Sequence, residues 1–497
     1  MSRDGRCDSL VSFRALGLWP GSHSEGVRSM TAAQPIKAVL IGAGDRGKDT
    51  YGHYALEHPD EIRFVAVAEP LQERRDAFAQ QHQIPLNRCY PTWEPLLEQP
   101  KMGDAALICT QDRLHARPAL AALESGYHVL LEKPMAPTAE ECKQLVDTAE
   151  RQGLHLQICH SLRYAPFFQT IYRVIQSGEL GELVCLSQRE NVSYWHMAHS
   201  YVRGNWRRCD LGNALILAKG CHDFDLLQWF AGARARQISS FGSLSHFRSE
   251  HAPPGAPRRC TDNCSIEPDC IYSAIDIYVR LGPLLQVARM SDARFLKMVA
   301  KLLERQPALT EQLARVVTPL RQLTEYSGWP VSVVTTDFTR KGRLQAIRDS
   351  SNPYGRCVYH CDNDVVDHQH VNIEFENGVT ATLIMHGHSY AEGRTIRIDG
   401  SKATLIGEMY LHRQRIELFD KRTGRKRILL TEGLRLGNAA HGGGDAGLMS
   451  AFAALIRGDW KPAAASGARG ALESHLMAFA AEQSRIEGKV IQMAALR

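Results

Sequence analysis

The chain has 497 residues, of which 44% are hydrophobic and 23% are charged, so it can form two or three packed domains. The net charge of +5 is small for this length, and basic residues are mixed with acidic ones, which disfavours nucleic acid or an anionic membrane as a partner. The thirteen cysteines are scattered, which indicates free thiols in a reducing compartment, and we expect a cytoplasmic protein. A run of about 18 apolar residues, which would predict a membrane-spanning helix, is absent from the sequence.

The first 34 residues carry several arginines, but their apolar run is too short for a signal peptide. We expect residues 1–34 to be a disordered extension, with Met30 as an alternative start. A transit peptide is the other interpretation, and Asp4, Asp8 and Glu25 argue against it.

The first predicted strand, residues 36–41, runs directly into a glycine-rich turn, GAGDRG. Glycines at this spacing permit a tight turn, close approach of a pyrophosphate and close packing of the next helix. A second apolar strand, 62–68, ends at Glu69, where dinucleotide-binding folds place an acid that binds the adenosine ribose. These features predict a dinucleotide site. Its predicted turn contacts are Gly42, Gly44, Asp45, Arg46 and Gly47.

Strands and helices then alternate up to about residue 160. Helices are predicted over 71–82, 115–125 and 138–153, and strands over 104–110, 128–131 and 154–159. This alternation predicts an α/β fold with a doubly wound parallel sheet, whose ligands lie beyond the carboxyl ends of the strands. The candidate residues at those ends are Thr110, Gln111, His115, Glu132, Lys133, Pro134 and His160.

After residue 160 the pattern changes to pairs of strands joined by short turns. Such pairs flank Asn377-Gly378 and Asp399-Gly400, as in β-hairpins. We therefore predict a C-terminal α/β domain with a large, mainly antiparallel open sheet and a helical insertion at about 281–350. The expected domains are a Rossmann NAD(P)-binding domain over 35–158 and a substrate and oligomerisation domain over 159–497.

The string HVLLEKP, residues 128–134, follows the strand that ends at Thr110 and the helix that begins at His115. In this context it resembles the Gfo/Idh/MocA oxidoreductases, closely over residues 35–240 and more loosely afterwards. The resemblance implies a dinucleotide-binding domain, an α/β domain with an open sheet, and substrates that are sugars, cyclitols or their derivatives. It also implies a homo-oligomer formed through the open sheet face, and a place for Lys133 beside the nicotinamide and the substrate hydroxyl.

Residues 160–164, HSLRY, are similar to the segment where this family begins to line its substrate pocket. The resemblance therefore implies substrate-binding roles for His160, Arg163 and Tyr164.

Residues 212–232 resemble the family helix whose histidine, here His222, faces the substrate. Many dehydrogenases of the family carry an aspartate four residues before that histidine, whereas this chain has Ala218 followed by Lys219. The usual proton relay is therefore in question. The predicted catalytic residues are Lys133, His222 and Lys219, and Asp223 is predicted to contact the substrate.

Oxidation of an alcohol by NAD needs a group that takes the hydroxyl proton, and such a base works best with a pKa near the operating pH. Desolvation and neighbouring positive charge lower the pKa of a lysine toward that range, and Lys133 is expected to experience both. In the structural alternatives, Lys133 only pairs with Glu132, and His222 is a core histidine beside Leu226.

Residues 194–207, YWHMAHSYVRGNWR, form a predicted loop rich in aromatic and polar side chains, which suits a carbohydrate. The alternative is a structural loop that its aromatic residues anchor to the core. Asp445, before an apolar helix, is predicted to be its N-cap or part of the pocket rim. The predicted substrate contacts of the loop are Trp195, His196, His199, Arg203 and Trp206.

Five cysteines have spacings that partly fit a zinc site, but none forms a C-x-x-C pair, so separate thiols are favoured and no metal is assigned. They are Cys260, Cys264, Cys270, Cys357 and Cys361.

The sequence thus favours an NAD-dependent oxidoreductase that transfers hydride between nicotinamide and a hydroxyl of a sugar-like polyol or glycoside. Glu69 favours NAD because its carboxylate repels a 2′-phosphate, although Arg74 and Arg75 lie just beyond it. Two alternatives stay open. One is an NAD-dependent glycosidase that oxidises its sugar transiently, and the other is a non-catalytic dinucleotide-binding regulatory protein, which Lys133 and His222 disfavour.

Overall fold

The computed structural model describes residues 34–291, 294–305, 321, 324–433, 440–459 and 467–497. The predicted N-terminal extension, apart from Gln34, lies outside the described residues. In the part of the chain that is described, no helix combines the length and the apolar character needed to cross a bilayer.

The first sheet has six parallel strands in the order β3-β2-β1-β4-β5-β6. The order reverses between β1 and β4, and ligands of such sheets bind beyond the carboxyl ends at that position. The strands are β1 (Ile36–Ile41), β2 (Ile62–Ala68), β3 (Cys89–Tyr90), β4 (Ala105–Ile108), β5 (His128–Leu131) and β6 (Leu156–Ile158). The helices between them are α1 (His53–Glu57), α2 (Gln72–Gln81), α3 (Trp93–Leu97), α4 (Ala116–Glu124) and α5 (Ala139–Arg151).

The predicted doubly wound parallel sheet is therefore confirmed, and its elements lie close to the predicted ranges. The start of α5 follows the predicted capping pattern, because Thr138 Oγ1 accepts a hydrogen bond from the Glu141 backbone N–H. Every residue of β4 is buried, as expected for a central strand covered on both faces.

The second sheet has nine strands in the order β14-β13-β12-β11-β7-β10-β9-β8-β15. Its neighbours are antiparallel except β7 and β10, which confirms the predicted mainly antiparallel sheet. The strands are β7 (Leu183–Ser193), β8 (Ala235–Ser243), β9 (His368–Phe375), β10 (Thr380–Ser389), β11 (Gly393–Gly400), β12 (Ala403–Tyr410), β13 (Arg413–Asp420), β14 (Lys426–Glu432) and β15 (Ile491–Gln492).

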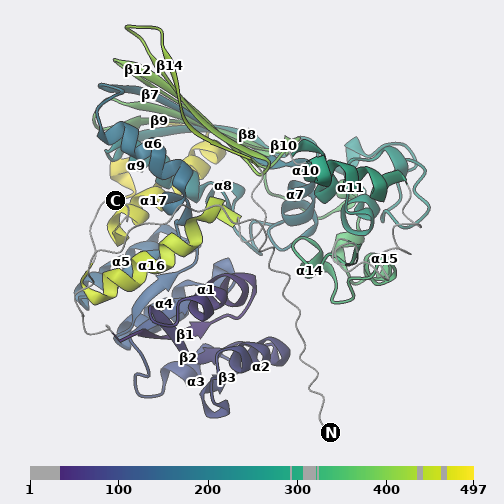
Figure 1. Ribbon diagram of the computed structural model, residues 1–497, viewed down its shortest axis with the longest axis horizontal. Helices are drawn as coiled ribbons and strands as arrows, with labels where there is room; N and C mark the ends of the chain where they lie inside the picture. The colour runs from purple at the N-terminus through teal and green to yellow at the C-terminus, as the bar shows by residue number, and fades with distance from the viewer. Residues whose placement is uncertain (1–33, 292–293, 306–320, 322–323, 434–439, 460–466) are drawn as a thin grey trace. The chain divides into compact units, whose positions relative to one another are not determined.

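Helices α6 (Pro166–Gln176), α9 (Cys221–Ala231) and α17 (Ala468–Glu487) lie along one side of this second sheet (Figure 1). The short helix α8 (Leu215–Ala218) precedes α9, and α16 (Gly444–Arg457) lies beside the first sheet. The helices of the predicted insertion gather beside one end of the second sheet in Figure 1. They are α10 (Gly282–Met290), α11 (Arg294–Arg305), α14 (Val331–Val334) and α15 (Arg340–Arg348).

Two local predictions were wrong. Residues 194–203 are helical rather than a loop, as α7 (Tyr194–His196) continues through Met197–Arg203, and Met197, Tyr201 and Val202 bury their side chains there. Gly443, with a φ of +86°, occupies the N-cap of α16 in place of Asp445. The Asp445 carboxylate pairs with Arg46 at 2.7 Å, while a left-handed glycine starts the helix.

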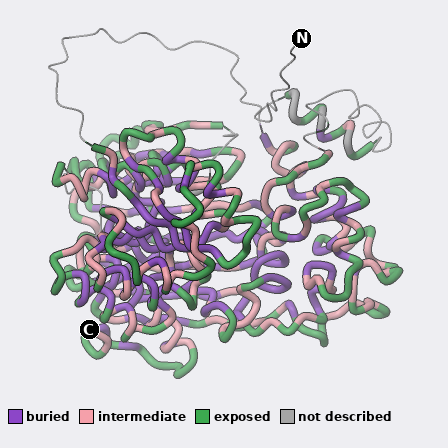
Figure 2. Tube along the Cα trace, turned by 90° about the horizontal axis from the view of Figure 1, so that it is seen from below, coloured by how far each residue is buried: buried purple, intermediate pink, exposed green. Residues whose placement is uncertain are grey.

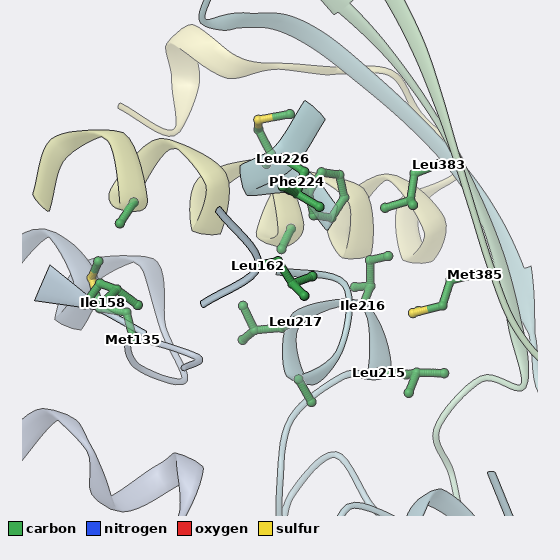
Figure 3. Packing of buried hydrophobic residues seen from close by; sticks show 14 of the residues in the cluster. Met135, Ile158, Leu162, Leu215, Ile216, Leu217, Phe224, Leu226, Leu383 and Met385 are labelled. Atoms are coloured by element: carbon green, nitrogen blue, oxygen red, sulfur yellow. The ribbon is translucent and has the colours of Figure 1, made fainter. Parts of the chain in front are cut away.

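A single large apolar cluster joins the two sheets. Figure 3 shows Met135 and Ile158, from the end of the first sheet, on one side of Leu217, and Leu383 and Met385 of β10 on the other. In Figure 2 the buried segments gather on the left of the view, and exposed segments line the outside. Each such buried side chain contributes about 1.5–3 kcal/mol, so the loops after β5 and β6 are firmly held against α8 and α9.

Candidate functional site

The glycine turn after β1 leaves open space where a pyrophosphate would lie. Gly42 has a φ of +96°, and a Cβ there would lie 2.6 Å from the Cys109 carbonyl oxygen, while a Cβ at Gly47 would collide with the Gly42 carbonyl. At Gly44, by contrast, an added Cβ would meet Arg74 Nη1 at 3.9 Å, an ordinary contact. The helical segment Asp45–Gly52 starts at this opening, and a helix N-terminus favours phosphate. The turn therefore fits a dinucleotide.

Glu69 is buried at the end of β2, next to the turn. Its Oε2 accepts a hydrogen bond from the Ala43 backbone N–H at 2.8 Å, and its Oε1 accepts one from the Leu71 N–H at 3.0 Å. Each carboxylate oxygen retains a second acceptor position that suits a ribose hydroxyl. Arg75 donates a hydrogen bond to the Glu69 backbone carbonyl oxygen at 2.7 Å and therefore binds the backbone of Glu69.

Glu132 is the buried anchor of the loop that carries Lys133. Its Oε1 accepts hydrogen bonds from Arg46 Nε and from the Tyr51 hydroxyl, both at 2.6 Å. Burial opposes its ionisation, but the charges of Arg46 and Lys133 and the bond from Tyr51 outweigh it and lower the pKa of Glu132 to about 2. Arg46 also pairs with Asp445 of α16 at 2.7 Å, so its guanidinium is engaged by two carboxylates.

Two buried histidines hold the residues that follow Lys133. His115 Nδ1 lies 2.7 Å from the Pro134 carbonyl oxygen, and its Nε2 lies 3.1 Å from that of Thr110. His475 Nε2 accepts from the Met135 backbone N–H at 2.9 Å, and its Nδ1 donates to the Ala471 carbonyl at 2.7 Å. This arrangement requires a neutral His475, and burial lowers the pKa of its ring to about 3. The loop is thus supported on both sides of Lys133.

Lys133 itself is half-buried, and its Nζ donates to the Ala218 carbonyl oxygen at 3.2 Å. Ala218 is the residue that occupies the position of the aspartate found in many dehydrogenases of the family that the sequence resembles. Burial lowers the pKa values of His160 and His196, and the charge of Lys133 lowers them further. The charge of Lys133 therefore acts on a group of buried histidines.

His222 and His160 lie together in this group, with ring centroids 5.6 Å apart. Arg163 binds Asp225 of α9 through two hydrogen bonds, of 2.6 and 2.8 Å, and both side chains are buried. His222 is therefore held beside His160, and the Arg163 guanidinium fixes α9 through Asp225.

Lys219 lies between two carboxylates. Its Nζ is 3.1 Å from Glu392 Oε1 and 3.3 Å from Glu190 Oε1. Burial opposes its charge, but the two carboxylates outweigh burial and raise the pKa of Lys219 above its usual value. Lys219 therefore keeps its proton at neutral pH.

Asp223 is also engaged by a cation. Arg394 Nε lies 2.9 Å from Asp223 Oδ1, and Arg394 Nη2 lies 2.7 Å from Glu190 Oε2. The roles of Glu190, Glu392 and Arg394 could not be predicted from the sequence, because these residues lie singly in strands and turns and belong to no motif.

Other predicted substrate contacts bind partners in three different places. His199 Nδ1 lies 2.8 Å from the Tyr278 hydroxyl, and Arg203 donates to the Tyr272 carbonyl at 2.7 Å, so both side chains are directed toward the segment after β8. Trp206 Nε1 instead donates to Asp112 Oδ2 at 3.0 Å, close to Thr110 and Gln111. The Tyr164 hydroxyl accepts from Gln157 at 3.0 Å.

The twelve described cysteines are free thiols. Among the described residues, no three side chains of His, Cys, Asp or Glu come together in an arrangement that could hold a metal ion.

Comparison with known proteins extends these observations. Inositol 2-dehydrogenase of Corynebacterium glutamicum is 26% identical over 227 residues, which are 43% of this chain and 60% of that protein. Alpha-N-acetylgalactosaminidase of Bacteroides fragilis is 30% identical over 157 residues, which are 30% of this chain and 36% of that protein. The chain spans about half the length of the curated relatives it matches.

A crystal structure of an oxidoreductase from Agrobacterium radiobacter, in complex with NAD+, L-tartaric acid and magnesium, has the same fold. It superimposes with a TM-score of 0.58 at 14% identity, over 93% of this chain and 100% of that one. Residues 36–160 match the family described as oxidoreductase family, NAD-binding Rossmann fold, and residues 168–266 match the GFO/IDH/MocA C-terminal domain. Residues 36–160 and 168–266 therefore belong to the Gfo/Idh/MocA oxidoreductase family.

Proposed function

We propose that the protein is an NAD-dependent oxidoreductase that acts on a CH–OH group of a sugar-like polyol or glycoside. The observation that carries the proposal is the position of Lys133. Its loop is anchored by Glu132, His115 and His475, and its Nζ lies 3.2 Å from the Ala218 carbonyl beside His160 and His222. A half-buried amine beyond a parallel strand of a dinucleotide-binding sheet is where a proton acceptor for an alcohol is needed.

NAD held at the glycine turn and Glu69 would supply the hydride acceptor. Lys133 would bind the substrate hydroxyl and take its proton. Lys219 is the weaker candidate for this role, since the carboxylates of Glu190 and Glu392 hold its proton. His222, across from His160, would orient the same hydroxyl or its neighbour.

The substrate class follows from the polar surroundings of this lysine. Carboxylates and histidines suit a molecule with several hydroxyls. The similarity to an inositol 2-dehydrogenase supports the same class.

The proposal is tested by incubating the protein with NAD and a panel of sugars, cyclitols and glycosides. We expect NADH absorbance to rise together with a carbonyl product. Cleavage of a glycoside without accumulation of NADH would replace the proposal by a redox-neutral glycosidase. Binding of NAD without any turnover across the panel would favour a regulatory protein.

Cofactor choice gives a separate prediction. Replacing Glu69 with Ser removes the charge that repels a 2′-phosphate and leaves Arg74 near the turn, so the ratio of NADP to NAD affinity is expected to rise. NAD should also bind more weakly, because hydrogen bonds to a charged group contribute about 1.5–3 kcal/mol. Titration of both cofactors into each protein measures the ratio. Glu73→Ser, at an exposed acid of α2, is the matched control, and a wild type that already prefers NADP would refute this assignment.

A further inference from the structure

The hydrogen-bond partner of Lys133 in the candidate site is the Ala218 carbonyl oxygen, 3.2 Å from its Nζ. Ala218 is the last residue of α8, and the last carbonyls of a helix have no partner within it. A neutral lysine amine has two N–H groups and one lone pair. When one N–H is donated to a fixed carbonyl, the lone pair can point in fewer directions. The position of the Ala218 carbonyl therefore decides how well Lys133 can face a substrate hydroxyl.

Lys219, the residue after Ala218, is held by its backbone and by its side chain. Its N–H donates to the Leu215 carbonyl oxygen at 2.9 Å, within the last turn of α8. Its Nζ lies 3.1 Å from Glu392 Oε1 and 3.3 Å from Glu190 Oε1. Because Glu190 belongs to β7 and Glu392 directly precedes β11, Lys219 ties the end of α8 to the second sheet.

The start of α9 is tied to the same two strands. Arg394 of β11 binds Asp223 Oδ1 through its Nε at 2.9 Å and Glu190 Oε2 through its Nη2 at 2.7 Å. Glu190 thus pairs with Lys219 through one carboxylate oxygen and with Arg394 through the other. The five residues form a carboxylate clamp that holds the end of α8 and the start of α9 against the sheet. They are Glu190, Lys219, Asp223, Glu392 and Arg394.

Glu392 is the most firmly bound carboxylate of the clamp. The Ser193 backbone N–H and hydroxyl both donate to its Oε2, at 2.9 and 3.1 Å, and His196 Nδ1 lies 3.0 Å from its Oε1. Burial opposes its ionisation, but His196, Lys219 and these hydrogen bonds outweigh burial and lower the pKa of Glu392 well below its usual value. An ionised carboxylate in a fixed position therefore faces the Lys219 ammonium.

We propose that Lys219 is a positioning residue for Lys133. Paired with Glu190 and Glu392, it fixes the Ala218 carbonyl so that Lys133 aims its lone pair at the substrate hydroxyl. The inference rests on the proposed function, because it concerns the amine that takes the hydroxyl proton there. Lys219 keeps its own proton throughout the reaction and acts on the rate only through Lys133.

Replacing Lys219 with Met and with Arg separates positioning from proton transfer. Lys219→Met removes the cation of the clamp, and turnover is expected to fall about 10²-fold, the effect of a misplaced catalytic group. Lys219→Arg should keep turnover within about 10-fold of wild type, because a guanidinium binds two carboxylates but does not give up its proton. The Michaelis constant for NAD should stay unchanged in both, since the glycine turn and Glu69 lie on other loops. A Lys219→Arg protein as slow as Lys219→Met, or a Lys219→Met protein as fast as wild type, overturns the proposal.

The Lys133→Met background gives a readout that a merely structural residue would not move. If Lys219 acts through Lys133, adding Lys219→Met to Lys133→Met should lower the residual turnover no further, so the two effects are not additive. A second loss of about 10²-fold in the double variant would show that Lys219 acts independently, which contradicts the proposal.

Glu392→Gln tests the clamp from the carboxylate side, since it keeps the shape of the side chain and removes its charge. Turnover is expected to fall as in Lys219→Met, and the variant with both changes should be no slower than Lys219→Met alone. Wild-type turnover in Glu392→Gln counts against the clamp. The matched control is Glu473→Gln, at a buried carboxylate paired with Arg497 at 2.7 Å, which should leave turnover unaltered. If Lys219→Met does not fold, Glu392→Gln alone and combined with Lys133→Met decides the question.

The failure of the clamp and of the proposed function can be told apart. A wild type that oxidises an alcohol while Lys219→Met and Glu392→Gln do so at the same rate refutes the clamp alone. A wild type that oxidises no CH–OH group refutes the proposed function and with it the positioning role of Lys219.

Discussion

Replacing Lys133 with Met is expected to reduce turnover by about 10² to 10⁴, the range typical of a lost acid–base group. Methionine preserves most of the apolar stem but cannot accept a proton. NAD binding should be retained, because the glycine turn and Glu69 lie on other loops. Steady-state rates on a substrate from the alcohol panel, with a calorimetric NAD titration, measure the two properties separately.

Two controls make the Lys133 experiment decisive. Lys101→Met changes an exposed lysine of the same domain and should leave turnover unaltered. His222→Gln should slow the reaction without preventing NAD binding. If Lys133→Met turns over near the wild-type rate, the proton acceptor lies elsewhere, and His222 becomes the leading candidate because Lys219 is held as a cation.

The dinucleotide site was predictable because its signals are local in sequence. Gly42 and Gly47 have no room for a side chain, and Glu69 follows an apolar strand directly. Both features can therefore be recognised within a stretch of about 30 residues of sequence. The position of Lys133 was predictable for a related reason. It follows a four-residue buried strand, and strand ends of a parallel sheet meet at one edge.

The support of that lysine could not be predicted, because it depends on long-range contacts between residues without a motif. His475 lies 340 residues beyond Met135 in the chain, on an apolar helix where a histidine carries no recognisable signal. Glu392 meets Lys219, and Arg394 meets Asp223, only after β11 has aligned beside β7. His199 and Arg203 were predicted to contact the substrate from their residue type alone. In the structure both side chains bind the segment after β8.

The second large effect concerns Glu132, the anchor of the Lys133 loop. Glu132→Gln removes one of the two carboxylates that pair with the partly buried Arg46 and leaves Asp445 as the other, which we expect to cost about 3 kcal/mol, the lower end of the range for breaking a buried pair. We expect the free energy of unfolding to fall by that amount at pH 7. Turnover should also fall, because an uncharged amide oxygen accepts weaker hydrogen bonds from Tyr51 and Arg46 and holds the loop less firmly. Urea unfolding followed by circular dichroism measures the first effect. Glu408→Gln, which breaks an exposed pair with Arg413, should cost no more than about 1 kcal/mol.

The pH dependence of stability tests the same carboxylate through its charge. The folded protein lowers the pKa of Glu132 from 4.5 to about 2, so ionised Glu132 stabilises the fold above pH 4.5, and this contribution is lost as the pH falls toward 2. At about 1.4 kcal/mol per pKa unit, the contribution is about 3 kcal/mol. The difference in unfolding free energy between wild type and Glu132→Gln should therefore be largest near pH 7 and shrink toward pH 2. A difference that stays constant over this range would mean that the glutamate acts through its hydrogen bonds, since Glu132 is the titratable group by which the two proteins differ.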